Sequence, residues 1–232
     1  MIYSASLRKA TLLRRYKRFL ADVELEDGTL VTAHCPNTGS MESCHAEGCI
    51  VWLSYSDNPA RKLQWTWEFT QTDDGLIGVN TARPNQVVSM AVEEGLIPNL
   101  TGYKTVRREV KYGKNSRIDL LLEAPDRKPC YVEIKNATLC RGDMILFPDA
   151  VTERGLKHLE ELSDMVKLGH RAVMLFFVNR PDGRAFSVAD AIDPKYGVGL
   201  RKAMASGVEV MAIRAISTPQ GMTTGESVPL EL

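Results

Sequence analysis

Asp119, Glu133 and Lys135 are the side chains of this sequence whose types and spacing could hydrolyse a phosphate ester. Two carboxylates, together with the backbone carbonyl of Ile134, can supply part of an octahedral oxygen site for Mg²⁺ or Mn²⁺. A lysine beside such an ion could orient or deprotonate a water, or neutralise the charge that develops on a phosphate. The alternative for any single acid on a strand is a surface salt bridge. We predict a metal site at Asp119, Glu133 and Ile134, with Asp119, Glu133 and Lys135 as the catalytic residues.

A predicted β-hairpin would position these groups. The β-rich runs 116–122 and 131–135 flank a polar turn at 125–129, a pattern typical of two short antiparallel strands. Side chains alternate between the faces of a strand, so the acid and the lysine of the second run should share a polar face. In the first run, the apolar side chains should lie together on the face opposite to the acid: Ile118, Leu120 and Leu122.

The composition describes an ordinary globular chain. Among 232 residues, Lys and Arg number 29 and Asp and Glu number 29, which argues against a polycation of the histone kind. Any nucleic-acid binding must therefore come from local patches. The five cysteines, with no secretory signal after Met1, predict reduced thiols and a cytoplasmic protein. No apolar run approaches the roughly 20 residues that a membrane-spanning helix needs.

Short alternating runs with closely spaced turns predict a small β-barrel over roughly the first 80 residues. The strand candidates are 19–25, 30–34, 49–55, 63–70 and 76–80. We expect Trp65, Trp67 and Phe69 in the core of this barrel, the alternative being a platform on which bases stack.

The period of the pattern changes after Pro84. Helices are predicted at 85–95, 149–168 and 194–206, and strands at 104–112, at the hairpin, and at 171–178 and 208–216. Hairpin strands followed by a β-α-β passage predict an α/β domain with a mixed central sheet. The residues after Thr218 show no pattern that predicts a helix or a strand. We place the boundary between a domain at 1–82 and a domain at 83–232.

Three groups of polar residues could bind a nucleic acid. A basic run interleaved with aromatic residues could track a phosphate backbone, with a solvated strand as the alternative. A basic strand lies near the proposed site, and a helical i, i+4 pair could clamp a phosphate unless it is a solvated helix face. The candidates are Arg14, Arg15, Lys17 and Arg18 in the first group, Arg107, Arg108 and Arg117, with Lys104, Lys111 and Lys114, in the second, and Arg154 with His158 in the third.

The segment from His34 to Cys49 holds two further candidates. Cys35, Cys44 and Cys49 with nearby histidines could bind zinc, but they contain no CxxC pair, so we predict isolated, partly buried thiols. The loop 36–41 is small and polar, and it could present Asn37 and backbone N–H groups to a phosphate. An ordinary tight turn is the alternative for this loop.

The acids and the lysine resemble the motif of the PD-(D/E)XK nuclease superfamily, whose core runs helix, three strands, helix, strand. Ile118 stands where the motif has proline. The resemblance implies a Mg²⁺ site, and it implies that Glu93 or Glu94, on the helix before the sheet, could supply a further acid near the metal.

Longer runs resemble a more specific family, the bacterial and archaeal sugar fermentation stimulation protein A family. These runs are Cys35–Met41, Asn115–Asp119, Val132–Asn136 and Phe147–Leu159. The resemblance spans nearly the whole chain and implies an N-terminal OB-fold domain joined to a PD-(D/E)XK nuclease-like domain. It further implies DNA binding and a link to the regulation of maltose metabolism, which the residues themselves do not indicate.

We therefore predict an OB-fold-like β-barrel joined to a nuclease-like α/β domain, acting as a Mg²⁺-dependent nuclease on single-stranded or double-stranded DNA. A DNA-binding regulator that keeps the nuclease fold without catalysis is the alternative, and RNA is a third possible partner.

Overall fold

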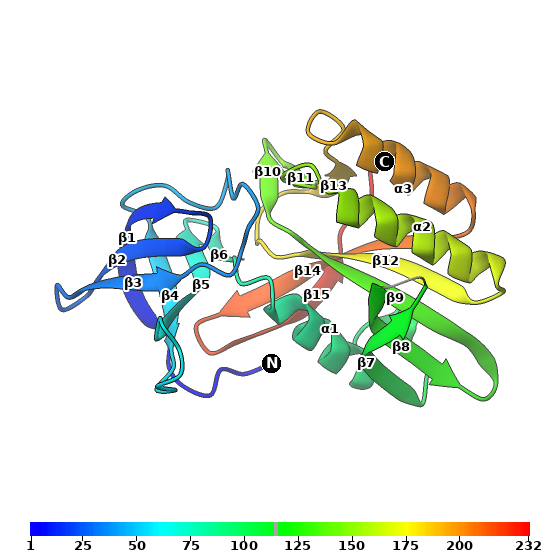
Figure 1. Ribbon diagram of the computed structural model, residues 1–232, viewed down its shortest axis with the longest axis horizontal. Coiled ribbons are helices and arrows are strands. Elements are labelled where there is room, and N and C mark those ends of the chain that lie inside the picture. The colour runs from blue at the N-terminus through cyan, green and yellow to red at the C-terminus, as the bar shows by residue number, and fades with distance from the viewer. Residues whose placement is uncertain (114–115) are drawn as a thin grey trace.

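The computed structural model describes residues 1–113 and 116–232. A β-barrel and a mixed sheet covered by helices lie side by side in it (Figure 1). Lys114 of the predicted basic strand and Asn115 of the family-like run lie outside the described residues. In the described part of the chain, no helix has the length and apolar character needed to cross a membrane.

The first strands close into a barrel, which confirms the OB-fold-like prediction. Its strands are β1 (Arg8–Tyr16), β2 (Leu20–Leu25), β3 (Leu30–His34), β4 (Ile50–Tyr55), β5 (Trp65–Thr72) and β6 (Gly75–Gly78). They are ordered β3-β2-β1-β4-β5-β6, and a parallel pairing of β3 with β5 joins the two sides of the sheet. Closure removes the free edges that an open sheet of this size would expose.

Alternation along the barrel strands fills its core. Leu12, Val23, Leu53 and Trp67 are fully buried there. Phe69 is also buried, but it points away from the barrel and packs into the core of the second domain, under α1 (Arg83–Glu93). The register of β5 against β4 shifts between Trp52 and Leu53, and this shift changes the side to which Phe69 points. The core prediction is confirmed for Trp67, while Trp65 is only half-buried and packs against Tyr55.

The second half of the chain forms a mixed sheet, as predicted. Its helices are α1 (Arg83–Glu93), the 3₁₀ turn η1 (Pro98–Leu100), α2 (Glu153–Lys167) and α3 (Pro194–Ala205). Its main sheet has the order β15-β14-β12-β9-β8-β7, in which β12 is parallel to both neighbours and the outer pairs are antiparallel. The strands are β7 (Thr105–Tyr112), β8 (Ser116–Ala124), β9 (Arg127–Ala137), β12 (Arg171–Val178), β14 (Glu209–Thr218) and β15 (Gly221–Ser227).

A second, small sheet and β15 were not predicted from the sequence. The small sheet contains β10 (Leu139–Arg141), β11 (Met144–Phe147) and β13 (Ala185–Val188). These strands are short, and β15 alternates polar residues with few apolar ones, so neither gives a strong period.

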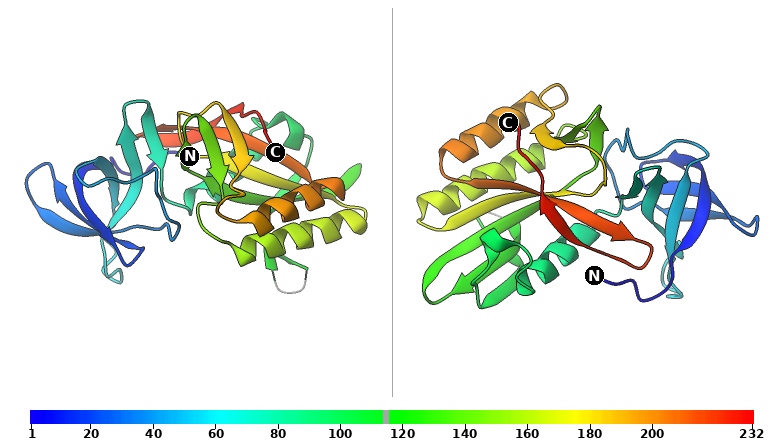
Figure 2. Two further views of the ribbon diagram at one scale, coloured as in Figure 1. Left: turned by 90° about the horizontal axis from the view of Figure 1, so that it is seen from above. Right: turned by 180° about the vertical axis from the view of Figure 1, so that it is seen from behind.

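Helices cover both faces of the main sheet (Figures 1 and 2). One core layer lies under α2 and α3 and contains Phe176 and Tyr196, and the other lies under α1 and contains Val88 and Phe177. Helix α2 begins at Glu153, later than predicted, because the Thr152 side chain caps it by accepting a hydrogen bond from the backbone N–H of Gly155.

The predicted alternation in β8 is wrong at Ile118. Leu120 and Leu122 pack under α1, whereas Ile118 packs in the layer under α2 and α3. Pairing of β8 with β9 stops at Leu120, and the backbone N–H of Ile134 donates instead to the Asp119 side chain, at 2.7 Å. The two strands diverge at this point, which breaks the period of two.

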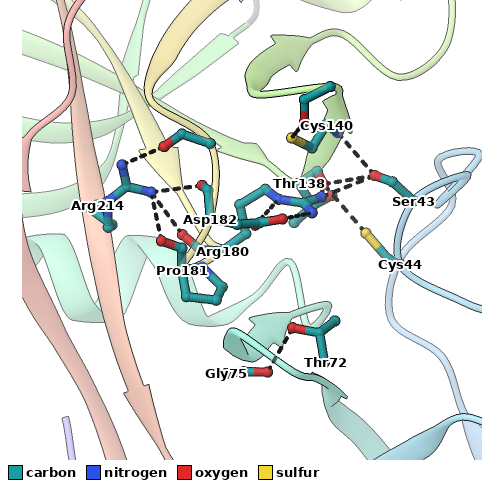
Figure 3. Close-up of polar contacts among 12 residues, drawn as sticks. Ser43, Cys44, Thr72, Gly75, Thr138, Cys140, Arg180, Pro181, Asp182 and Arg214 are labelled. Atoms are coloured by element: carbon teal, nitrogen blue, oxygen red, sulfur yellow. Dashed lines mark hydrogen bonds and ion pairs between the residues drawn. The ribbon is translucent and has the colours of Figure 1, made fainter.

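Several contacts join the barrel to the sheet domain, including three that lie far apart in the sequence. Ile2 forms a β-bridge with Gly221, and the backbone N–H of Gly78 donates to the carbonyl of Asn179. In the third contact, Ser43 and Cys44 of the barrel meet Thr138 and the buried guanidinium of Arg180 (Figure 3). The two parts are therefore tied at points far apart in the sequence.

Candidate metal and nucleic-acid site

A cavity of about 480 Å³ lies where the barrel meets the sheet domain. Most of its lining comes from the divergence point of β8 and β9, the loop before α2 and the first turns of α2, and the barrel contributes the β1–β2 turn and the loop after β3. The cavity brings together eight of the residues predicted from the sequence: Arg18, Asn37, Asp119, Glu133, Ile134, Lys135, Arg154 and His158.

Asp119 lies at the point where β8 and β9 separate. Its Oδ2 accepts from the backbone N–H of Ile134 and its Oδ1 accepts from the amide of Asn85, at 2.6 Å. Burial first, and then the negative charge of Glu133, raise the pKa of the Asp119 carboxyl from 3.8 to about 6, against the lowering effect of its hydrogen bonds. A carboxylate held in this way gains from a nearby cation.

Glu133 is 2% exposed and is held from one side only. Its Oε1 accepts from Lys135 Nζ at 2.7 Å and from His158 Nδ1. Burial opposes ionisation, but the hydrogen bond from His158 and the charge of Lys135 prevail and hold the pKa of the Glu133 carboxyl below its usual value. Its Oε2 is buried and has no hydrogen-bond partner among the described residues.

The residues present fit a hard divalent cation. Mg²⁺ usually takes only one or two protein carboxylates and completes its shell with water and phosphate oxygens. Asp119 and the unpartnered Oε2 of Glu133 would provide the carboxylates, with the Ile134 carbonyl beside them. Among the described residues no cluster of three or more His, Cys, Asp or Glu side chains could hold a metal, so such an ion would depend on those further oxygens.

Helix α1 does not supply a further acid. Glu93 and Glu94 are exposed and do not line the cavity, so the expectation for them is wrong. The helix instead directs Asn85, from its first turn, onto Asp119. Sequence reasoning missed Asn85 because a single amide at a helix start carries no signal by itself.

His158 has a different place from the one predicted. We expected it to hold a phosphate oxygen, but its Nδ1 is bonded to Glu133 and its Nε2 accepts from Arg154 Nε at 3.4 Å. Both ring nitrogens are therefore engaged by protein side chains. His158 is 4% exposed, and its contacts orient the Glu133 carboxylate and the Arg154 side chain.

Arg15 also has a structural task. Its guanidinium donates to the backbone carbonyls of Asn37, Gly39 and Ser40, and to that of Arg18. These bonds use its donors to hold the loop after β3, so Arg15 does not present a free fork to a phosphate. Asn37 likewise uses its side-chain oxygen locally, accepting from the backbone N–H of Gly39.

The remaining predicted basic residues do not line the cavity. Arg14 pairs with Asp22 and Arg107 pairs with Glu123, both at the surface. The others whose side chains are exposed and have no ion pair or hydrogen bond among the described residues are Lys17, Lys104, Arg108, Lys111 and Arg117. Nucleic-acid binding by these residues stays a prediction, and for Arg107, Arg108 and Arg117 it would involve the edge of the main sheet.

Asp149 is a site residue that the sequence did not reveal. Its Oδ2 accepts from the backbone N–H of Met41 at 3.1 Å and from Ser40 Oγ at 3.5 Å, which docks the barrel loop onto the segment before α2. Asp149 follows Pro148 in the run Phe147–Leu159 that resembles the family. Its place in that run was the feature of the sequence that could have pointed to it. The loop 36–41 is thus a wall of the cavity shared by both domains.

Gly39 is packed against this carboxylate, and replacing it by alanine should undock the loop. An added Cβ would lie 2.2 Å from Asp149 Oδ2, so the bond to Met41 must break. We expect Gly39→Ala to lower the free energy of unfolding by about 1–2 kcal/mol. Chemical denaturation of single and double variants checks this: in an Asp149→Ala background the same change should cost little. An equal cost in both backgrounds would contradict the contact.

The cysteines follow the prediction of isolated thiols. Cys35 and Cys44 are buried and Cys49 is partly buried, and all three are free. Burial raises the pKa of each thiol, which favours the protonated form over the thiolate that zinc requires.

Comparisons with known proteins agree with this architecture. The family model for the SfsA N-terminal OB domain matches residues 13–79, and that for the sugar fermentation stimulation protein RE domain matches residues 82–221. A sugar fermentation stimulation protein homolog of Geobacter metallireducens is 56% identical, with 97% of each chain covered. The homolog of Geobacter sulfurreducens is 54% identical, with 99% of this chain and 98% of that one covered.

A solved structure is also similar over the whole chain. The structure of Pyrococcus furiosus SfsA in complex with Ca²⁺ has a TM-score of 0.90 and 25% identity, and the match covers 100% of this chain and 98% of that one. The chain belongs to the sugar fermentation stimulation protein (SfsA) family, with an N-terminal OB domain and a restriction-endonuclease-like domain after it.

Proposed function

We propose that this protein is a nuclease that hydrolyses phosphodiester bonds in DNA with the help of Mg²⁺ or Mn²⁺. The observation that carries the proposal is the buried Glu133 oxygen without a partner, in one cavity with Asp119 and Lys135. A buried carboxylate oxygen left unpaired is costly, and a cation would remove that cost. The relative from Pyrococcus furiosus was solved with Ca²⁺, an ion with the same preference for oxygen ligands.

The cation, when bound, would supply Lewis-acid stabilisation of the charge that develops on the phosphate. The residues of the chain supply the rest. Lys135 Nζ donates to Glu133 Oε1 at 2.7 Å, which holds its ammonium group beside the cavity, where it can neutralise a phosphate oxygen or orient a water. Arg154 lines the same cavity and can bind a second oxygen of the backbone.

The second candidate function is DNA binding without cleavage, as a regulator of sugar metabolism. The exposed basic side chains on β7 and β8, away from the cavity, favour binding that does not involve the carboxylates. RNA would be held by the same charges. These alternatives differ from the nuclease in needing no divalent ion at Asp119 and Glu133.

Cleavage assays decide between the functions. Purified protein should cut plasmid, single-stranded or branched DNA in Mg²⁺ or Mn²⁺, and Lys135→Ala should lower the rate at least about a hundredfold, because a charge aimed at the transition state is lost. Lys195→Ala, an exposed lysine on α3 outside the cavity, is the matched control.

One result of these assays would contradict the nuclease proposal. If wild type cuts no more than an Asp119→Ala, Lys135→Ala double variant, the enzyme proposal fails. DNA binding that persists in EDTA, together with calorimetry that finds no divalent ion bound, would then support the regulator. Competition between DNA and RNA would identify the preferred nucleic acid.

A further inference from the structure

The turn between β1 and β2 has a backbone conformation that its residues disfavour. Lys17 and Arg18 have φ values of 48° and 66°, in the left-handed region that suits Gly or Asn. Positions with positive φ in hairpin turns are normally occupied by Gly, Asn or Asp. The chain thus carries two long cationic side chains where glycine would fold more easily, and strain of this kind gathers at functional sites.

Neighbouring groups hold this turn rigidly. The carbonyl of Arg18 accepts from the Arg15 guanidinium, which also grips the loop after β3, and the carbonyl of Phe19 accepts from the backbone N–H of Cys35. The turn is therefore fixed by the barrel rather than free to relax, and its side chains are presented in a set direction.

The side chains of the turn point to solvent at the edge of the cavity. Arg18 lines the cavity and is exposed, and neither it nor Lys17 forms a side-chain ion pair or hydrogen bond in the described part of the chain. Phe19, next to Arg18, is 48% exposed. The lining of the cavity also includes Val151, from the loop before α2, which is 71% exposed. Val151 is thus an apolar group of the cavity lining, and Phe19, which does not line the cavity itself, follows directly in the chain after a residue that does.

An exposed aromatic ring beside an arginine favours unpaired bases over a duplex. In a duplex the faces of the bases are stacked inside, so a ring at the mouth of a cavity would meet phosphates and gain nothing. A strand with unpaired bases offers a flat face to an aromatic side chain, and its phosphates offer charge to the adjacent arginine. Arg18 and Phe19 are consecutive, exposed residues of the turn, which suits that alternation of phosphate and base.

We propose that the turn Lys17–Phe19 is a strand-binding element at the mouth of the cavity, with Arg18 on a phosphate and Phe19 stacked on an unpaired base. The substrate class is then a nucleic acid with unpaired bases near the scissile bond, such as a single strand or a frayed end. This deepens the proposed nuclease function and rests on it for the cleavage step, but the binding step stands on the turn itself.

Binding measured in EDTA separates the two steps. Fluorescence anisotropy with a labelled single-stranded 20-mer and the corresponding duplex would compare wild type, Phe19→Ala and Leu30→Ala, where Leu30 is a matched apolar residue, 67% exposed on the same barrel. Phe19→Ala should weaken single-strand binding about tenfold or more and leave duplex binding unchanged, as expected for one lost stacking partner. Leu30→Ala should change neither.

A second variant tests the strain and the contact together. Lys17→Asn combined with Arg18→Gly suits the turn better, so the melting temperature should rise by about 2–4 °C while single-strand binding falls. A 2-aminopurine base in the strand should lose fluorescence on binding wild type, by stacking, and keep it on binding Phe19→Ala.

Two results would overturn the proposal. One is equal single-strand binding by Phe19→Ala and Leu30→Ala, and the other is an equal loss for single strand and duplex in Phe19→Ala. A protein that binds single strands through Phe19 but cuts nothing in Mg²⁺ would leave the turn proposal standing and remove the nuclease. Cleavage that is unaffected by Phe19→Ala on every substrate would leave the nuclease proposal standing and remove the turn proposal.

Discussion

Replacing Arg180 by alanine should lower the free energy of unfolding by about 3 kcal/mol, because its guanidinium is the centre of the contact between barrel and sheet domain. Arg180 is 5% exposed. It forms a bidentate ion pair with Asp182 and donates to Ser43 Oγ and to the carbonyl of Thr138 (Figure 3). Its removal takes away the ion pair with Asp182 and one donor each from Ser43 Oγ and the Thr138 carbonyl, and it leaves a gap between the two domains.

Denaturant unfolding of matched variants checks this expectation. Arg201→Ala removes an arginine that also forms a bidentate pair, with Asp190, but at the surface, and its stability should not change measurably. Arg180→Lys keeps the charge without the planar fork and should recover only part of the loss. An Arg180→Ala protein with the denaturation midpoint of wild type would show that the contact contributes nothing to stability.

Removing the charge of Asp119 should stabilise the protein when no metal is present. Its pKa rises from 3.8 to about 6 in the folded state, through burial and the charge of Glu133, so the folded protein holds this proton to a higher pH than the unfolded chain. The free energy of unfolding should therefore fall as pH rises from about 4 to about 6, by up to about 3 kcal/mol from this group.

An Asp119→Asn variant makes the effect measurable. In EDTA at pH 7.5 it should be about 2 kcal/mol more stable than wild type, because the buried charge is removed. The gain is smaller than about 3 kcal/mol because one amide oxygen cannot accept from both the Ile134 N–H and Asn85. At pH 4, where the Asp119 carboxyl is largely protonated, the variant should be less stable than wild type by about 1 kcal/mol, the cost of that lost hydrogen bond. Added Mg²⁺ should then raise the melting temperature of wild type and leave that of Asp119→Asn unchanged.

The matched control is Asp126→Asn, since this acid lies in the hairpin turn with its side chain 70% exposed. It should change stability little at either pH and should keep the response to Mg²⁺. An Asp119→Asn protein that is less stable than wild type at both pH values would contradict the argument from burial.

Local patterns in the sequence were enough to predict the elements that carry the site. Alternation predicted the strand of Glu133 and Lys135, and the helical period predicted the helix of Arg154 and His158, because each depends on neighbours a few residues away. The same reasoning failed at Ile118, where the Asp119 side chain takes a hydrogen bond that a regular ladder would give to the backbone.

Contacts between distant parts of the chain could not be predicted. Asp149 accepts a hydrogen bond from a loop that begins more than a hundred positions earlier, and the Arg15 guanidinium donates to backbone carbonyls of that same loop. An arginine in a basic run looks identical in sequence whether it meets a phosphate or a carbonyl. The role of His158 likewise depends on the side chains that contact its two ring nitrogens, which are Glu133 from β9 and Arg154 from the same helix.

The bridge between Ile2 and Gly221 has a consequence for synthesis on the ribosome. The segment before β1 cannot reach its final pairing until the start of β15 has emerged, and at ~5–20 residues per second that delay is about 10–40 s. The loop that Asp149 and Arg180 hold must also wait for their part of the chain. The barrel would therefore form early with one wall of the cavity still undocked, and that wall would be completed only after the segment that carries Asp149 and Arg180 has emerged.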